Sequence, residues 1–256
     1  MFQSKIKKIF AGVLCVFLWL NLLAQDNNVL LQQAKNLELK FDEAGALEKY
    51  KAILANDPSN TTALLKCTEF YCNIGERQKD KKVKTIYFDS ADAVAQKFIA
   101  LNTDQSSANY AMSLVALKKT EVEDDNKKLI DEIKQMKTYV DISLNADANN
   151  AKANFLCGMW HYNMIKLSWI KKGPIKSFCN CIPDTQLDSA AAYMEKCKTI
   201  DPYYALNYLQ LAKVYQDDNQ PAKGLDVLNK LVRLPNRTFD DAAIKNEGKQ
   251  MLSGMQ

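Results

Sequence analysis

Apolar and polar residues alternate along most of the chain with the spacing of amphipathic helices, and one two-helix pattern recurs. In the stretch 30–58, the small residue Ala34 precedes a second small residue, Ala46, by 12 positions, and Tyr50 follows. An Asp-Pro pair then closes the stretch at Pro58. Residues three and four apart share one face of a helix, so this spacing predicts two antiparallel helices that pack through their small residues.

The same positions recur further along the chain, at Gly158, Ala190, Pro202, Ala212 and Tyr215. Two middle units, 64–101 and 108–147, keep the apolar spacing in a degenerate form. A single helix pair cannot bury its apolar face, so the pairs must stack on one another. The chain resembles tetratricopeptide-repeat proteins over 25–256, which implies an all-α superhelix of stacked antiparallel helix pairs.

One unit of this array is longer than the others. Ala190 lies 32 positions after Gly158, where the first pair needs 12, so we expect an inserted segment at about 162–184. The stretch 151–172 predicts one long helix, apolar on most sides, that ends at Gly173-Pro174 and is covered by its neighbours.

The inserted segment is the predicted partner-binding surface. Trp160 and Trp169 are nine residues apart, about two and a half turns, so they point from roughly opposite faces. We expect Trp160 to be packed in the core and Trp169 to face a partner. The side chains expected to bind with Trp169 are Tyr162, Lys171, Lys172 and Lys176.

A more specific resemblance rests on Gly158-Met159-Trp160-His161-Tyr162, Leu167-Ser168-Trp169-Ile170, Pro183, Thr185, Ala190, Leu234-Pro235, Asp240-Asp241 and Met251-Leu252. Over roughly its C-terminal hundred residues the chain resembles the regulator of microtubule dynamics family. Eukaryotic members of that family are membrane-anchored repeat proteins that bind partners at microtubules or organelle contacts. The resemblance implies the repeat fold and a protein partner, but an exported chain would not meet those named partners.

The first 24 residues have the three parts of a secretory signal. Lys5, Lys7 and Lys8 precede an apolar run over 9–20, and the small residue Ala24 ends a short exit. We expect cleavage after Ala24 and a periplasmic or secreted protein, because the exit resembles bacterial export signals. The alternative is a chain tethered to the membrane by this segment left uncleaved. No later segment reaches membrane-spanning length, so we expect no span after cleavage.

Charge and composition exclude several classes of function. The chain has 34 Lys and Arg, and removal of the three signal lysines leaves 31 against 30 Asp and Glu. This near-neutral balance argues against a nucleic-acid partner. The sequence has one histidine, His161, and no Gly-rich phosphate loop, so we expect no catalytic site, no metal and no cofactor.

Six of the seven cysteines follow the signal. Cys67, Cys157 and Cys197 fall at positions where the repeat buries a small apolar residue. Cys179 and Cys181 lie in the inserted segment, where an oxidising compartment would couple one of them to Cys157 or Cys197. One residue separates Cys179 from Cys181, which is too few for an ordinary zinc ligand pair.

These observations predict an exported, non-enzymatic protein-binding module, a scaffold or adaptor that holds a peptide or helix of a partner in the concave groove of the superhelix. The alternative is a structural subunit of an envelope assembly that associates with copies of itself. A dependence of the molecular mass on concentration would distinguish the two.

Overall fold

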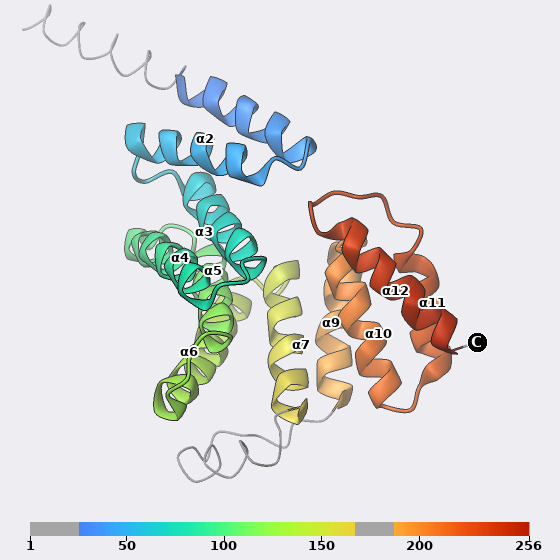
Figure 1. Cartoon of the computed structure of the whole chain (residues 1–256). Helices are drawn as coiled ribbons and strands as arrows, with labels where there is room; N and C mark the ends of the chain where they lie inside the picture. Colours follow the sequence, from blue (N-terminus) through green and yellow to red (C-terminus); the bar gives the residue numbers. More distant parts are fainter. Residues whose placement is uncertain (1–25, 167–186, 256) are drawn as a thin grey trace, which may run out of the picture.

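The computed structural model describes residues 26–166 and 187–255, and every regular element in these ranges is an α-helix (Figure 1). A first helix spans 26–39. The others are α2 (Glu43–Asn56), α3 (Thr61–Glu76), α4 (Lys81–Leu101), α5 (Gln105–Thr120), α6 (Asn126–Ala146), α7 (Ala151–Lys166), α9 (Leu187–Ile200), α10 (Ala205–Asp217), α11 (Pro221–Leu231) and α12 (Asp241–Met255).

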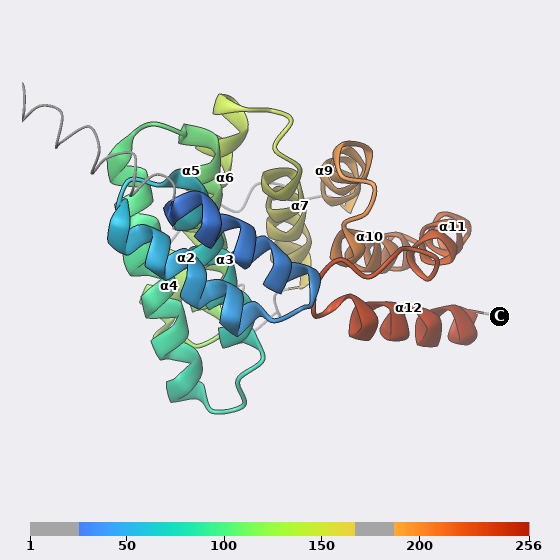
Figure 2. The same ribbon diagram turned by 90° about the horizontal axis from the view of Figure 1, so that it is seen from above.

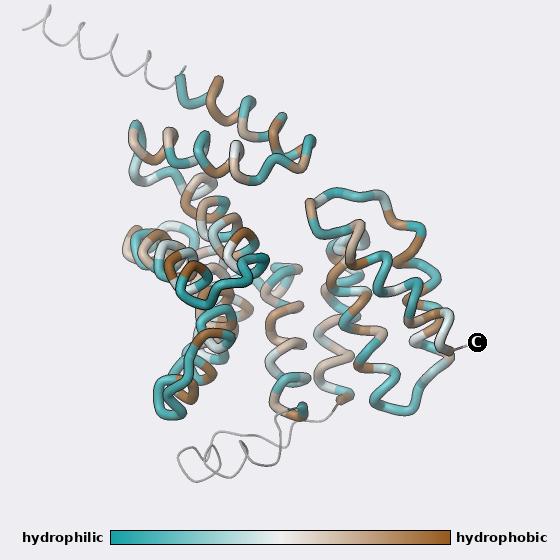
Figure 3. Tube along the Cα trace, viewed as in Figure 1, coloured by the Kyte–Doolittle hydropathy of each residue, from teal (hydrophilic) through white to brown (hydrophobic). Residues whose placement is uncertain are grey.

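Consecutive helices pack as antiparallel pairs, and the pairs stack along the chain. Helix 26–39 packs with α2, α3 with α4, α5 with α6, α7 with α9 and α10 with α11, while α12 packs on the last pair. Apolar and polar residues alternate along each helix in Figure 3, as expected for helices that bury one side against their neighbours. The predicted all-α superhelix of stacked helix pairs is confirmed.

The stack curves, with the first helix of each pair on the inside. α3 packs on α5, α5 on α7, α7 on α10 and α10 on α12. Close packing along one edge of a stack bends the stack toward that edge. We call the side formed by α3, α5, α7 and α10 the inner face. The curve brings the connection 232–240 back toward the turn between helix 26–39 and α2 (Figures 1 and 2).

Short polar side chains set the start of most helices. An Asp or Asn at the N-cap accepts a backbone N–H of the first turn in each of five successive helices, at Asp42, Asn60, Asp80, Asp104 and Asp125. Such caps satisfy N–H groups that have no partner within the helix. Because these caps are local, the sequence indicates where the helices begin before any packing is known.

Small residues allow the helices of a pair to approach closely. A Cβ at Gly158 would lie 2.7 Å from the Cγ atom of Met194 and 3.0 Å from the carbonyl oxygen of Ala190, so α7 and α9 meet at a distance that only glycine permits. Ala34, Ala46, Ala190 and Ala212 are all buried at the corresponding positions.

Helix α7 lies between the two halves of the core. Its buried residues contact α5 and α6 on one side and α9 and α10 on the other. Trp160 is 3% exposed, and its indole N–H donates to the carbonyl oxygen of Ile133 at 3.3 Å. The helix is described from Ala151 to Lys166, and the remainder of the predicted helix, 167–172, lies outside the described residues.

Among the helices of the described ranges, none has both the length and the apolar character needed to span a membrane.

Candidate functional site: the inner face of the superhelix

A buried carboxylate joins three successive pairs on the inner face. Glu69 of α3 is 7% exposed and accepts a hydrogen bond from the hydroxyl of Tyr110 of α5 at 3.1 Å. It also pairs with the ammonium group of Lys152 of α7. Burial of a carboxylate held in this way costs little free energy, because each partner offsets part of the penalty for removing the charge from water.

Charges around Glu69 decide its ionisation. Burial alone would raise the pKa of Glu69, but Lys152 and Lys66 outweigh that effect and hold it below its usual value. Burial raises the pKa of Tyr110, which therefore remains a hydrogen-bond donor. At neutral pH the inner face thus holds a charged carboxylate between two lysines.

The network continues toward the N-terminus through Lys66. Its ammonium group lies 2.7 Å from the carboxylate of Glu38, which also accepts the hydroxyl of Tyr50. The side chains of Lys66 and Lys152 keep 31% and 41% of their surface exposed. The inner face therefore presents two cations to solvent, on two helices, α3 and α7, that have three other helices between them along the chain.

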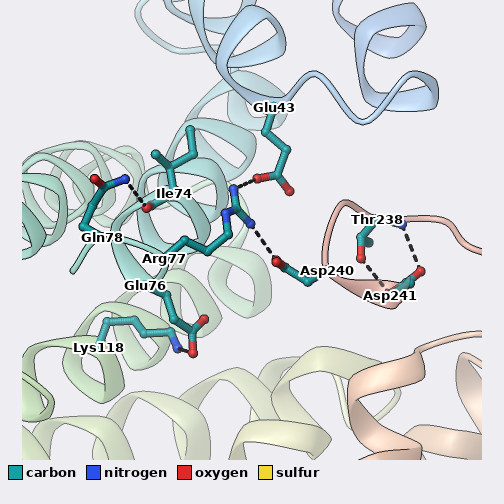
Figure 4. Close-up of polar contacts among 9 residues, drawn as sticks. All are labelled: Glu43, Ile74, Glu76, Arg77, Gln78, Lys118, Thr238, Asp240 and Asp241. Atoms are coloured by element: carbon teal, nitrogen blue, oxygen red, sulfur yellow. Dashed lines mark hydrogen bonds and ion pairs between the residues drawn. The ribbon is translucent and has the colours of Figure 1, made fainter. Parts of the chain in front are cut away.

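A second charged group lies at the end of α3. Lys118 of α5 is almost fully buried and pairs with Glu76 at 2.8 Å and with Glu121 at 3.1 Å. Burial would lower the pKa of Lys118, but the two carboxylates raise it above its usual value, so the ammonium group stays charged. Figure 4 shows Lys118 and Glu76 beside Arg77, whose side chain extends from the end of α3.

Arg77 connects the beginning and the end of the superhelix. Its guanidinium pairs with Glu43 in the first turn of α2 and with Asp240, 2.6 Å away, just before α12 (Figure 4). The same guanidinium lies 4.5 Å from the ring centre of Phe239. Burial raises the pKa of Glu43 and that of Asp240, and the neighbouring guanidinium only partly opposes this shift.

Each ionised side chain of these groups is held by a partner of opposite charge. In the described ranges no set of three or more His, Cys, Asp or Glu side chains is arranged to hold a metal ion. Burial raises the pKa of the Cys157 thiol to about 11 and that of Cys197 to about 12, so both thiols stay protonated at neutral pH.

The sequence model of the family described as "Regulator of microtubule dynamics protein 1-3" matches residues 30–256. The chain belongs to this family. The mouse regulator of microtubule dynamics protein 1 (Mus musculus) is 26% identical over 121 residues, 47% of this chain and 40% of that protein. The rat protein 3 of the family (Rattus norvegicus) is 23% identical over 236 residues, 89% of this chain and 49% of its own. The chain thus spans no more than about half the length of these relatives.

A solved structure shows the same fold. A thermophilic TPR protein of Thermus thermophilus superposes with a TM-score of 0.64 at 12% identity, covering 88% of this chain and 99% of that protein. At this identity the similarity establishes the helical-repeat fold of this family member.

Of the partner-binding residues predicted from the sequence, Tyr162 lies in the described ranges, and its hydrogen bond is not part of the inner-face network. The hydroxyl of Tyr162 donates to Asp217 at 2.7 Å, and Lys166 pairs with the same carboxylate, so Tyr162 joins α7 to α10. The other predicted residues lie outside the described residues: Trp169, Lys171, Lys172, Lys176, Cys179 and Cys181. The four described cysteines, Cys67, Cys72, Cys157 and Cys197, are buried and carry free thiols.

Some of the predicted repeat positions lie in turns and others at contacts between helices. Pro58 and Pro202 are exposed in the turns that follow α2 and α9, and Tyr215 donates its hydroxyl to Glu195 at 2.8 Å. His161, the family member's one histidine, stacks on the ring of Tyr193 at 5.6 Å. Burial lowers the pKa of His161, and the charge of Lys137 lowers it further.

The residues predicted from the sequence do not include Glu69, Lys118 or Arg77, nor the side-chain role of Asp240. Glu69 and Lys118 are charged residues that interrupt otherwise apolar helix faces, and such an interruption is a signal for a buried ion pair. Asp240 was named from the sequence only as one of the residues on which the family resemblance rests. The sequence contains no comparable signal for Arg77, because its partners are far away along the chain.

Proposed function

We propose that this chain is an exported, non-enzymatic protein-binding module, a scaffold or adaptor that holds a peptide or helix of a partner protein against its inner face. The observation that carries the proposal is the polar network of Glu38, Lys66, Glu69, Tyr110 and Lys152 on the inner face. A segment lying across this face would meet side chains from several helix pairs at once.

The exposed ends of Lys66 and Lys152 favour an acidic or polar segment over an apolar one. Each lysine already has a carboxylate partner, so a partner's carboxylate would share the ammonium group rather than meet an unpaired charge. The relatives are called regulators of microtubule dynamics, and we carry over from them only the binding of a protein partner.

Comparative capture tests the site. The chain from Gln25 onward, immobilised, is incubated with a periplasmic or envelope extract of its source cell and compared with Lys66→Gln/Lys152→Gln and with Lys51→Gln. Lys51 pairs with Glu48 on the exposed side of α2, so Lys51→Gln controls for the loss of a lysine charge away from the inner face. We expect the double variant to lose proteins that the wild type and Lys51→Gln retain, at unchanged helical content.

Retention of the same proteins by all three chains would contradict an inner-face site. A molecular mass that rises with concentration, with no captured partner, would favour the alternative of a self-associating structural subunit.

Export is tested separately: N-terminal sequencing of the protein from its native compartment should begin at or near Gln25. Recovery of the intact N-terminus in a membrane pellet would favour the tethered form.

A further inference from the structure

The guanidinium of Arg77 is already occupied by a short segment of the same chain. Asp240 accepts one of its N–H groups at 2.6 Å, and the ring of the preceding residue, Phe239, lies 4.5 Å from its centre. Arg77 and Asp240 are 163 residues apart in sequence. Two adjacent side chains, one aromatic and one acidic, therefore contact one guanidinium.

A guanidinium is suited to this combination of partners. Its edge presents N–H donors in a plane that matches a carboxylate, and its face stacks on aromatic rings. Glu43 has a mostly buried side chain and pairs with another edge of the Arg77 guanidinium. Glu43 therefore orients the guanidinium independently of Phe239 and Asp240. Any extended segment with an aromatic residue followed by an acidic residue offers the same two contacts.

The loop that carries Phe239 and Asp240 is held by bonds that do not involve Arg77. The carboxylate of Asp241 accepts the backbone N–H of Arg237 at 2.6 Å and that of Thr238 at 2.9 Å, together with the Thr238 hydroxyl. Phe239 remains 53% exposed. Release of Phe239 and Asp240 from Arg77 therefore uncovers little apolar surface and leaves the base of the loop in place.

We propose that Arg77 and Glu43 form a binding site for a partner segment in which an aromatic residue precedes an acidic residue, and that Phe239-Asp240 occupies this site in the unbound protein. The inference rests on the proposed function and names the chemistry of the partner. A tethered segment acts at an effective concentration of about millimolar, so a partner must displace it. Displacement frees the connection 232–240 from α3 and couples binding to the curvature of the superhelix.

The probe for this site is the capped hexapeptide acetyl-Asn-Arg-Thr-Phe-Asp-Asp-amide, the sequence of residues 236–241. It is titrated by calorimetry into the wild type, Phe239→Ala/Asp240→Asn, the same variant with Arg77→Gln, and the control Lys51→Gln. If the site is about nine-tenths occupied, removing the internal segment strengthens peptide binding by about tenfold. Adding Arg77→Gln should abolish it, and Lys51→Gln should match the wild type.

Two matched peptides, with Ala for Phe or Asn for the first Asp, should bind the opened variant more weakly. Hydrogen exchange of the wild-type protein gives a readout that needs no variant, since saturating peptide should speed amide exchange over 232–240. The proposal is wrong if the folded, opened variant binds no tighter than the wild type or if it binds without Arg77. It is also wrong if exchange over 232–240 is unchanged at saturation. Partner capture that persists in Arg77→Gln, together with failed peptide binding, would refute this inference and leave the proposed function standing.

Discussion

Truncation of Trp160 tests the packing at the centre of the stack. Trp160 lies in α7 against α6, with its ring almost fully buried and its indole N–H on the carbonyl oxygen of Ile133. Lys137 lies 5.3 Å over the same ring and also pairs with Asp141. Trp160→Ala removes the ring, the hydrogen bond and the cation–π contact together.

The loss of free energy of unfolding comes mainly from the cavity. The Ile133 carbonyl keeps its partner four residues later within α6, and Lys137 keeps Asp141, so no buried polar group is left alone. A buried Trp→Ala change then costs about 3–5 kcal/mol. At about 2–4 °C per kcal/mol for a chain of this size, the melting temperature should fall by about 6–20 °C.

The assay compares Trp160→Ala and Trp160→Phe with Trp169→Ala by thermal unfolding and hydrogen exchange. Each helix pair contacts its neighbours, so the Trp160→Ala change should speed exchange first in α6 and α7. Trp160→Phe keeps most of the buried ring and should lose less. We expect Trp169→Ala to leave melting nearly unchanged and to weaken partner binding. If both alanine variants melt at the same lowered temperature, Trp169 belongs to the core and the partner-binding prediction for that segment is wrong.

Three further predictions follow from the packing, the histidine and the cysteines. Ala212→Leu should overpack α10 and lower the free energy of unfolding by about 1–3 kcal/mol in chemical denaturation, and an unchanged midpoint would contradict the repeat register. Because the pKa of His161 is lowered in the folded chain, its contribution to stability is complete above the unfolded pKa of about 6.5 and is lost as the pH falls toward the folded value. His161→Phe should keep the stack on Tyr193 and remove this part of the pH dependence of melting, so an unaltered profile would contradict it. Native mass spectrometry should find no zinc and one or two disulfides at most, through Cys179 or Cys181, and zinc that survives dialysis against a chelator would refute this.

Local features of the fold could be predicted from the sequence. Ala34 and Ala46 mark a close helix contact because the residues that flank them repeat at helical spacing, and Gly158 marks a contact that admits no Cβ at all. Caps such as Asp125 depend on residues two and three positions away. Information of this kind lies within one helix pair, so the pattern of one pair is enough to recognise the next.

The inner-face network could not be predicted in the same way, because it depends on how the pairs stack. Glu69 and Lys152 are 83 residues apart, and their contact requires the curvature that brings α3 near α7. Arg77 and Asp240 require the whole superhelix to return on itself. A small change in the rotation between pairs would separate them without altering any single pair.

Glu69 and the two carboxylates that pair with Arg77 respond differently to acid. Lys152 and Lys66 hold the pKa of Glu69 below its usual value, so this carboxylate stays charged as the pH falls. Burial raises the pKa of Glu43 and Asp240 above their usual values, so each binds a proton at a higher pH than it would in the unfolded chain. The folded chain binds those protons more readily than the unfolded chain, and acid therefore weakens the ion pairs of Arg77 without loss of stability from these two groups. As the pH falls, the ion pair between Arg77 and Glu43 should therefore weaken before the contact between Glu69 and Lys152.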